Sequence, residues 1–183
     1  MALVYNAGRA HRCRFGWTDK EGNRAGDPGR ERSPNRDRFR VDSGPVKIAE
    51  IMNRSVATLS PEQTLGEVLT LLRTHRIRHL PVIDASSRLV GIVSDRDVKR
   101  ATPSLLSGVD REAYERVLDE TTVSQFMTRD PTSVAPDTSL KAVVKILVES
   151  KVGALPVVDD GHLVGIATDI DLLQYLYDIL PED

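Results

Sequence analysis

The sequence predicts an α/β protein, with α+β character, in which one unit of helices and strands occurs twice in tandem behind a disordered N-terminal tail. The segments 52–61 and 127–136 align at an offset of 75 residues. The alignment continues to residue 171, and 16 of the 45 positions in 127–171 are identical to their counterparts. Self-similarity at such a long period indicates that a whole structural unit has been duplicated.

Apolar residues at helical spacing predict the first long helix of each copy. They are Leu65, Val68, Leu69 and Leu72 in the first copy, and Leu140, Val143, Val144 and Leu147 in the second. Positions i, i+3, i+4 and i+7 lie on one face of a helix, so both helices should cover a core. Thr64 and Glu67 form a predicted capping box at the first helix, and Ser139 is the predicted cap of the second.

Two β-rich runs follow each of these helices and predict a hairpin. In the first copy residues 80–83 and 89–93 flank a polar loop, and in the second copy the loop shortens to 159–162. A further helix should begin at 94–97 and at 168–171, where oxygen-bearing side chains suit a helix start. Before the first long helix of each copy we expect a short helix and then a strand, which includes residues 56–58 in the first copy and 131–133 in the second. A linker helix is predicted over about 110–120.

Composition narrows the function classes. The 183 residues are 40% hydrophobic and 28% charged, which predicts a soluble protein with a buried core. The net charge of −2 gives no general basic field for nucleic acid. No apolar run approaches the ~20 residues that cross a bilayer. The single cysteine, Cys13, excludes an internal disulfide and a cysteine zinc site and fits a reducing compartment, so we expect a cytoplasmic protein.

Residues 1–45 differ from the rest of the chain. They hold ten basic and six acidic residues and six of the twelve glycines, a composition typical of disorder. The mixed charges favour a solvated tail, although the arginines would also suit nucleic acid or acidic lipid. Alternatively, natural translation begins at Val46. No apolar stretch follows the basic residues, so no secretory signal is expected.

Each copy carries Leu-Pro-Val before its hairpin and Gly-Ile-x-(Ser/Thr)-x-x-Asp after it. In this order and spacing, the motifs resemble a tandem pair of cystathionine-β-synthase (CBS) domains, the Bateman module. Residues 77–82 and 94–104 are also similar to acetoin-utilisation-type bacterial CBS proteins. The resemblance implies two β-α-β-β-α units packed with pseudo-two-fold symmetry. We expect a tail over 1–45, a first unit over 46–107, a linker helix within 108–122 and a second unit over 123–180.

A hydroxyl three residues before a carboxylate, at a helix start, suits a ribonucleotide. The pairs are Ser94 with Asp97 and Thr168 with Asp171. The hydroxyl, the free backbone N–H groups and the positive dipole end favour phosphate, and the carboxylate accepts from sugar hydroxyls. The resemblance implies the same roles, with Ser94 and Thr168 near phosphate and the two aspartates on ribose. The alternative is that both pairs are only helix caps.

The resemblance also implies that the base lies between the first strand and the start of the second. The walls would be Val56, Ala57 and Thr58 with His79, Leu80 and Pro81, and Pro131, Thr132 and Ser133 with Ala154, Leu155 and Pro156. The two clefts differ in charge. The first has Arg78, His79 and Arg96 where the second has Gly153, Ala154 and Ile170. We therefore expect ligand phosphate at the first unit, because arginine suits phosphate.

The function hypothesis is a sensor that binds an adenine nucleotide (AMP, ADP or ATP) or S-adenosylmethionine and transmits a conformational change to an unidentified regulated protein. The choice of adenine follows from the resemblance. We expect neither catalysis nor a metal, because the sequence has no nucleophile elbow, no P-loop and no metal-ligand spacing. Apolar residues near the C-terminus, Leu172, Leu173, Leu176 and Ile179, suggest a homodimer. The alternatives are an adaptor without a ligand and a nucleic-acid binder acting through the tail.

Overall fold

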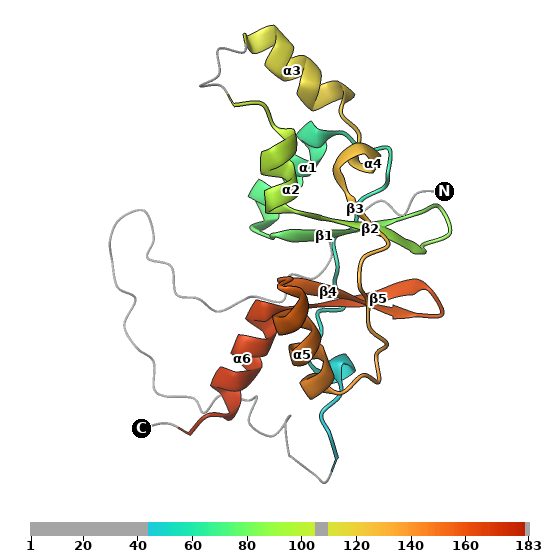
Figure 1. Cartoon of the computed structure of the whole chain (residues 1–183), viewed down its shortest axis with the longest axis vertical. Coiled ribbons are helices and arrows are strands. Elements are labelled where there is room, and N and C mark those ends of the chain that lie inside the picture. The colour runs from blue at the N-terminus through green and yellow to red at the C-terminus, as the bar shows by residue number, and fades with distance from the viewer. Residues whose placement is uncertain (1–43, 105–109, 182–183) are drawn as a thin grey trace, which may run out of the picture. The chain divides into compact units, whose positions relative to one another are not determined.

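The computed structural model describes residues 44–104 and 110–181. The chain divides into two units, residues 1–40 and 41–183, and the second unit holds both repeats. The predicted disordered tail lies almost wholly outside the described residues. Figure 1 shows the helices and strands of the second unit.

The first repeat combines a small antiparallel sheet with two helices. Its elements are α1 (Leu65–His75), β1 (His79–Ile83), β2 (Leu89–Ser94) and α2 (Asp95–Ala101). The predicted capping box of α1 is confirmed: Thr64 N donates to Glu67 Oε2 at 2.7 Å and Glu67 N to Thr64 Oγ1 at 3.4 Å. Helix α3 (Arg111–Glu120) follows, in the segment predicted to form a linker helix.

The second repeat has the same order of elements. They are α5 (Leu140–Ser150), β4 (Ala154–Asp159), β5 (His162–Thr168) and α6 (Asp169–Ile179). The β4–β5 turn places Asp160 at φ 48° and Gly161 at φ 82°. Two positive φ values in succession match a tight hairpin turn, in which glycine is favoured. The predicted long helices, hairpins and final helices of both repeats are thus confirmed.

The short segment before each repeat packs into the core of the other repeat. The segment with η2 (Ile48–Glu50) joins the second core, where Ile48 is fully buried, and Ile48 N donates to Thr138 O at 2.9 Å. Helix α4 (Val123–Phe126) joins the first core, and Val123 N donates to Gln63 O at 2.8 Å. The strand β3 (Thr128–Arg129) then pairs with β2. The two repeats therefore complete each other.

The predicted extent of the first strand is wrong in both repeats. Residues 56–58 and 131–133 do not lie within a strand, and only single parallel bridges form, Leu59 to Val82 and Val134 to Val157. Each segment leaves the core of the other repeat and joins the sheet of its own repeat only at this single bridge.

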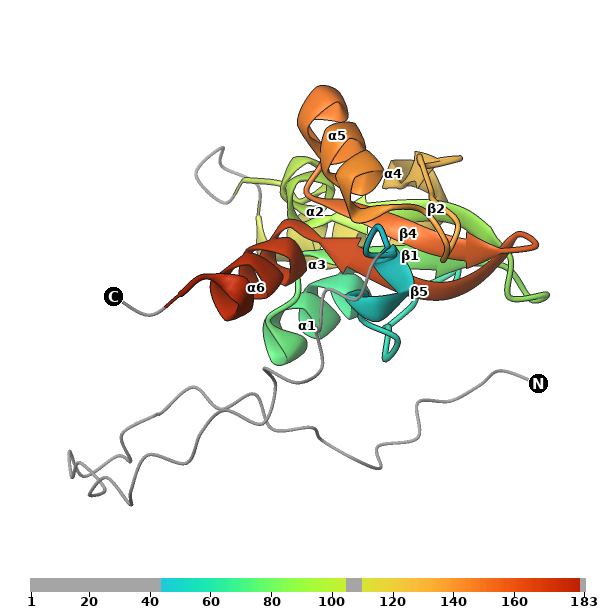
Figure 2. The ribbon, with the colours of Figure 1, turned by 90° about the horizontal axis from the view of Figure 1, so that it is seen from below.

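The two hairpins meet through their loops. Leu89 N donates to Gly161 O at 3.2 Å, and Arg88 and His162 form an isolated antiparallel β-bridge. Figures 1 and 2 show α1 and α2 against the β1–β2 sheet, with α5 and α6 against β4–β5. Among the described residues, none of the helices is both long and apolar enough to cross a membrane.

Candidate nucleotide-binding site

Ser94 and Asp97 form a closed hydrogen-bonded pair at the start of α2. The backbone N–H of Ser94 donates to Asp97 Oδ2 at 2.9 Å, and the Ser94 hydroxyl donates to the same oxygen at 2.6 Å. The Asp97 N–H donates back to Ser94 Oγ at 3.3 Å. These bonds are those of a capping box, and the two that reach the carboxylate both end on Oδ2. The cap itself does not use Asp97 Oδ1.

Thr168 and Asp171 repeat this arrangement at the start of α6. Thr168 N and Oγ1 donate to Asp171 Oδ2 at 2.8 and 2.7 Å, and Asp171 N donates to Thr168 Oγ1 at 3.3 Å. The same geometry at both positions shows that the duplicated motif is structurally equivalent in the two repeats. Each aspartate again keeps Oδ1 outside the cap.

The starts of α2 and α6 are tied to the preceding loops in the same way. Asp95 N donates to Arg78 O, and Asp169 N donates to Gly153 O, both at 3.0 Å. Arg78 and Gly153 are thus equivalent positions in the fold, as the alignment predicts. His79 pairs with Ser94 across β1 and β2, which places the Arg78–His79 pair beside the first motif.

Arg78 reaches from the first repeat to the second. Its Nη2 donates to Asp169 Oδ1 at 2.9 Å, and both side chains are about half exposed. No reciprocal pair exists at the equivalent position, because Gly153 has no side chain. Asp95, the counterpart of Asp169, instead accepts from Lys99 within α2 at 2.9 Å, and this bond lowers the pKa of Asp95.

His79 lies against Gly153 of the second repeat. A Cβ on Gly153 would come within 3.0 Å of His79 Cε1 and 3.2 Å of Nε2, so the imidazole occupies the space that a side chain would need. Burial lowers the pKa of His79, and the neighbouring Arg78 lowers it further, against the opposing charges of Asp169, Asp95 and Asp97. The neutral imidazole is favoured at this contact between the repeats.

The predicted base walls are only partly at the surface. Pro81, Pro156 and Ala154 are buried, together with Leu80 and Leu155. The backbone, however, joins the predicted segments: Leu59 N donates to Pro81 O at 2.9 Å, and Val134 N to Pro156 O at 3.1 Å. Residues 56–58 and 131–133, directly before these bonds, are partly or fully exposed. Arg96 is exposed on the first turn of α2.

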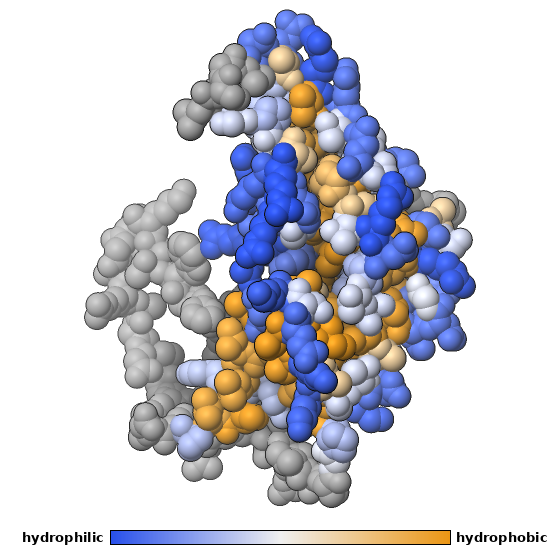
Figure 3. All heavy atoms as spheres, in the orientation of Figure 1, coloured by the Kyte–Doolittle hydropathy of each residue, from blue (hydrophilic) through white to orange (hydrophobic). Residues whose placement is uncertain are grey.

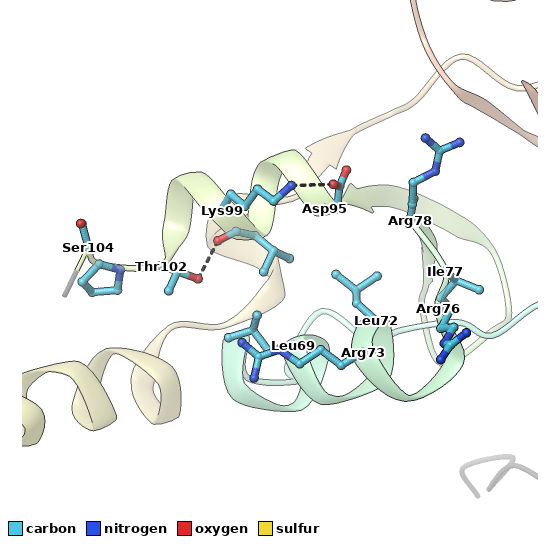
Figure 4. A pocket seen from close by; sticks show the side chains of 12 residues that line it. Leu69, Leu72, Arg73, Arg76, Ile77, Arg78, Asp95, Lys99, Thr102 and Ser104 are labelled. Atoms are coloured by element: carbon cyan, nitrogen blue, oxygen red, sulfur yellow. Dashed lines mark hydrogen bonds and ion pairs between the residues drawn. The ribbon is translucent and has the colours of Figure 1, made fainter. Parts of the chain in front are cut away.

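A pocket of about 620 Å³ opens between α1 and α2 (Figure 4). Of the residues predicted to bind nucleotide, only Arg78 lines it. Its other lining residues include Leu69 and Leu72, which the sequence assigns to the core. The signal in the sequence for this surface was the helical spacing of Leu69, Leu72 and Arg73 on α1, with Arg76 at the C-cap of the helix. Within the described residues, no cluster of three His, Cys, Asp or Glu side chains suits a metal.

The CBS domain profile matches residues 48–104 and 123–178, more than half of the chain. The chain belongs to the CBS-domain family. A CBS domain-containing protein of Dictyostelium discoideum is 32% identical over 136 residues, which cover 74% of this chain and 94% of the relative. The resemblance inferred from the paired motifs is thereby confirmed.

Solved CBS structures share the fold. The structure of a putative acetoin utilization protein (AcuB) from Vibrio cholerae matches with a TM-score of 0.62 and 35% identity. The match covers 74% of this chain and 93% of that chain. The structure of CBSX2 in complex with AMP matches with a TM-score of 0.62 and 29% identity, over 73% of this chain and 97% of that chain. The CBS domain pair of MJ0100, in complex with 5′-methylthioadenosine and S-adenosyl-L-methionine, matches with a TM-score of 0.60 and 25% identity. The match covers 72% of this chain and 99% of that chain.

Proposed function

We propose that this CBS pair is a regulatory module that binds one adenine nucleotide per chain beside the Ser94–Asp97 motif. AMP is the first candidate, followed by ADP, ATP and S-adenosylmethionine. The observation that carries the proposal is the meeting of Ser94, Asp97, Arg78 and His79 at the contact between the two repeats. The relatives that bind AMP and S-adenosylmethionine support an adenosine-containing ligand.

The free oxygen of Asp97 supports a ribose site. The cap occupies Oδ2 with two donors, while Oδ1 is the acceptor that vicinal ribose hydroxyls require. Capping and ligand binding are therefore compatible functions of the same carboxylate. The partly exposed segment 56–58, held beside Pro81 by the bond of Leu59, is the proposed wall for the base, and residues 131–133 are its counterpart in the second repeat.

Arg78 supports a phosphate site, and its ion pair with Asp169 supplies a way to transmit binding. A phosphate at Arg78 competes with Asp169 for the same guanidinium. Binding then weakens a contact between the repeats, so the ligand has different affinities for the paired and unpaired arrangements. Such a difference is what allows a ligand to shift a conformational equilibrium. The second repeat has Gly153 and Ala154 at these positions, which favours a single phosphate site.

Calorimetry on the full chain with AMP, ADP, ATP and S-adenosylmethionine tests the proposal. Asp97→Asn is the matched variant, because the single amide oxygen serves the cap and the NH₂ group then faces the ribose. Loss of that acceptor is expected to weaken binding by about 1–3 kcal/mol, roughly 5- to 150-fold. Asp171→Asn changes the same cap in the second repeat and should leave the affinity nearly unchanged. No heat and no thermal shift with any of the four ligands would overturn the proposal.

We further propose a cytoplasmic homodimer that acts on a separate regulated protein. The exposed apolar side chains of α6 support self-association. An adaptor that dimerises without a ligand is the competing function, and a dimer whose size and stability ignore all four ligands would favour it. Nucleic-acid binding through the tail concerns residues outside the described part of the chain. Deleting residues 1–45 would abolish it, and gel-shift assays would show strong salt dependence.

A further inference from the structure

His79 lies where the two repeats meet. It begins β1, and its ring lies against Gly153, the residue before β4. His79 is half-buried, whereas His75 and His162, the other two histidines that the structure describes, are exposed. Burial lowers the pKa of His79, and the positive charge of Arg78 lowers it further. Without a ligand, the imidazole of His79 is therefore mostly neutral at pH 7.

Charged groups from three parts of the fold face His79. They are Arg78 before β1, Asp95 and Asp97 on α2, and Asp169 on α6. Each carboxylate already has a partner. Asp97 accepts from the Ser94 hydroxyl at 2.6 Å, and Asp95 accepts from Lys99 at 2.9 Å. Asp169 accepts from Arg78 at 2.9 Å. Among the described residues, a protonated His79 thus has no carboxylate to itself.

A phosphate bound at Arg78 reverses this balance. It brings a charge of about −1.5 to −2 next to the ring at pH 7, and it engages the guanidinium that opposes protonation. It also frees Asp169, whose Oδ2 lies 3.7 Å from the point that a Gly153 Cβ would occupy, while His79 Cε1 lies 3.0 Å from the same point. Negative charge within about 4–6 Å favours the protonated form of a histidine. We therefore expect phosphate and proton to favour each other's binding.

The second repeat lacks these groups. Gly153 and Ala154 stand where the first repeat has Arg78 and His79. Figure 3 shows hydrophilic residues over α2 and hydrophobic residues over α6, which includes the exposed Ile170. The coupling between phosphate and proton should therefore belong to the first repeat alone.

We propose that AMP binding takes up one proton from solution onto His79, so that the module responds to pH and nucleotide together. This inference rests on the nucleotide site proposed above and adds the protonation of one residue to it. The imidazolium gives the phosphate a second cation beside Arg78, and both of its ring N–H groups are donors. By linkage, AMP binds more tightly as the pH falls. S-adenosylmethionine, which has no phosphate, should not show this response.

Calorimetry of AMP binding in buffers of different ionisation enthalpy counts the protons exchanged. At pH 7 we expect net uptake of a fraction of one proton per AMP, and an affinity that rises roughly two- to tenfold from pH 8 to pH 6.5. The sign identifies the group, because a phosphate with a second pKa of about 6 that binds as the dianion releases protons. His79→Asn should abolish the uptake. His162→Asn, which removes an exposed histidine, should retain it.

NMR of the histidine ring Cε1–H resonances follows His79 directly in the wild-type chain, where its signal is identified by its absence from the His79→Asn spectrum. Its titration should move to higher pH with saturating AMP, while the signals of His75 and His162 should be insensitive to AMP. If the variant binds AMP too weakly for calorimetry, this titration decides.

Three results would overturn the inference: AMP binding without proton uptake, uptake that persists in His79→Asn, or a His79 titration that AMP leaves in place. Each of these leaves the nucleotide site intact. A chain that binds no AMP at any pH would refute the nucleotide site and the proton coupling together, so the two failures are distinguishable.

Discussion

Replacing Asp169 by asparagine is expected to tighten AMP binding. Arg78 Nη2 lies 2.9 Å from Asp169 Oδ1, and the two side chains are 51% and 46% exposed. An exposed pair of this kind contributes about 0.2–1 kcal/mol, so a phosphate that displaces Asp169 loses up to that amount. Without the carboxylate, the affinity should rise by a factor of roughly 1.4 to 5. The same variant should lower the stability of the protein by no more than about 1 kcal/mol.

Calorimetry at constant ionic strength measures the effect, and a double-mutant cycle with Arg78→Ala identifies its cause. Arg78→Ala alone should weaken binding, and Asp169→Asn should have little further effect in that background. Asp178→Asn, at the far end of the same helix, controls for the change in net charge. Weaker AMP binding by the Asp169→Asn protein would refute the competition between Asp169 and phosphate.

Two further predictions concern the packing and the pH dependence. Gly91→Ala and Gly165→Ala should each destabilise the protein by about 1–3 kcal/mol in urea unfolding, because a Cβ would lie 2.6 Å from Met127 Sδ or 2.5 Å from Met52 Sδ. Wild-type stability in both variants would contradict the packing of the segment before each repeat against the other repeat. The lowered pKa of His79 means that the unfolded chain takes up the proton first, so the free energy of unfolding should fall as the pH drops from 6.5 through the folded pKa. His79→Asn should flatten this slope in denaturant titrations at several pH values, and an unchanged slope would show that another group is responsible.

The duplicated fold could be predicted from the sequence because its signals are local. The apolar stripe beginning at Leu65, the Thr64–Glu67 cap and the polar hairpin loops each act over a few residues. The same motif at a second position then made chance similarity an unsatisfactory explanation. The equivalent caps at Ser94 and Thr168 were predicted in the same way, together with the alternative that they are caps and no more.

The contacts between the repeats could not be predicted, because they depend on long-range placement. Nothing near Ile48 indicates that it packs in the second core, and nothing near Val123 indicates the first. The Arg78–Asp169 pair joins residues 91 positions apart. The burial of Pro81 likewise follows from the packing of the finished sheet. The duplication predicts equivalent positions, and only the folded chain shows which side chains meet between them.

Native mass spectrometry of the full chain titrated with AMP tests the central claim most directly. The account predicts one AMP per chain, lost or strongly reduced with Asp97→Asn and retained with Asp171→Asn. A chain that stays free of AMP at millimolar concentrations, or one whose binding depends on Asp171 and ignores Asp97, would contradict it.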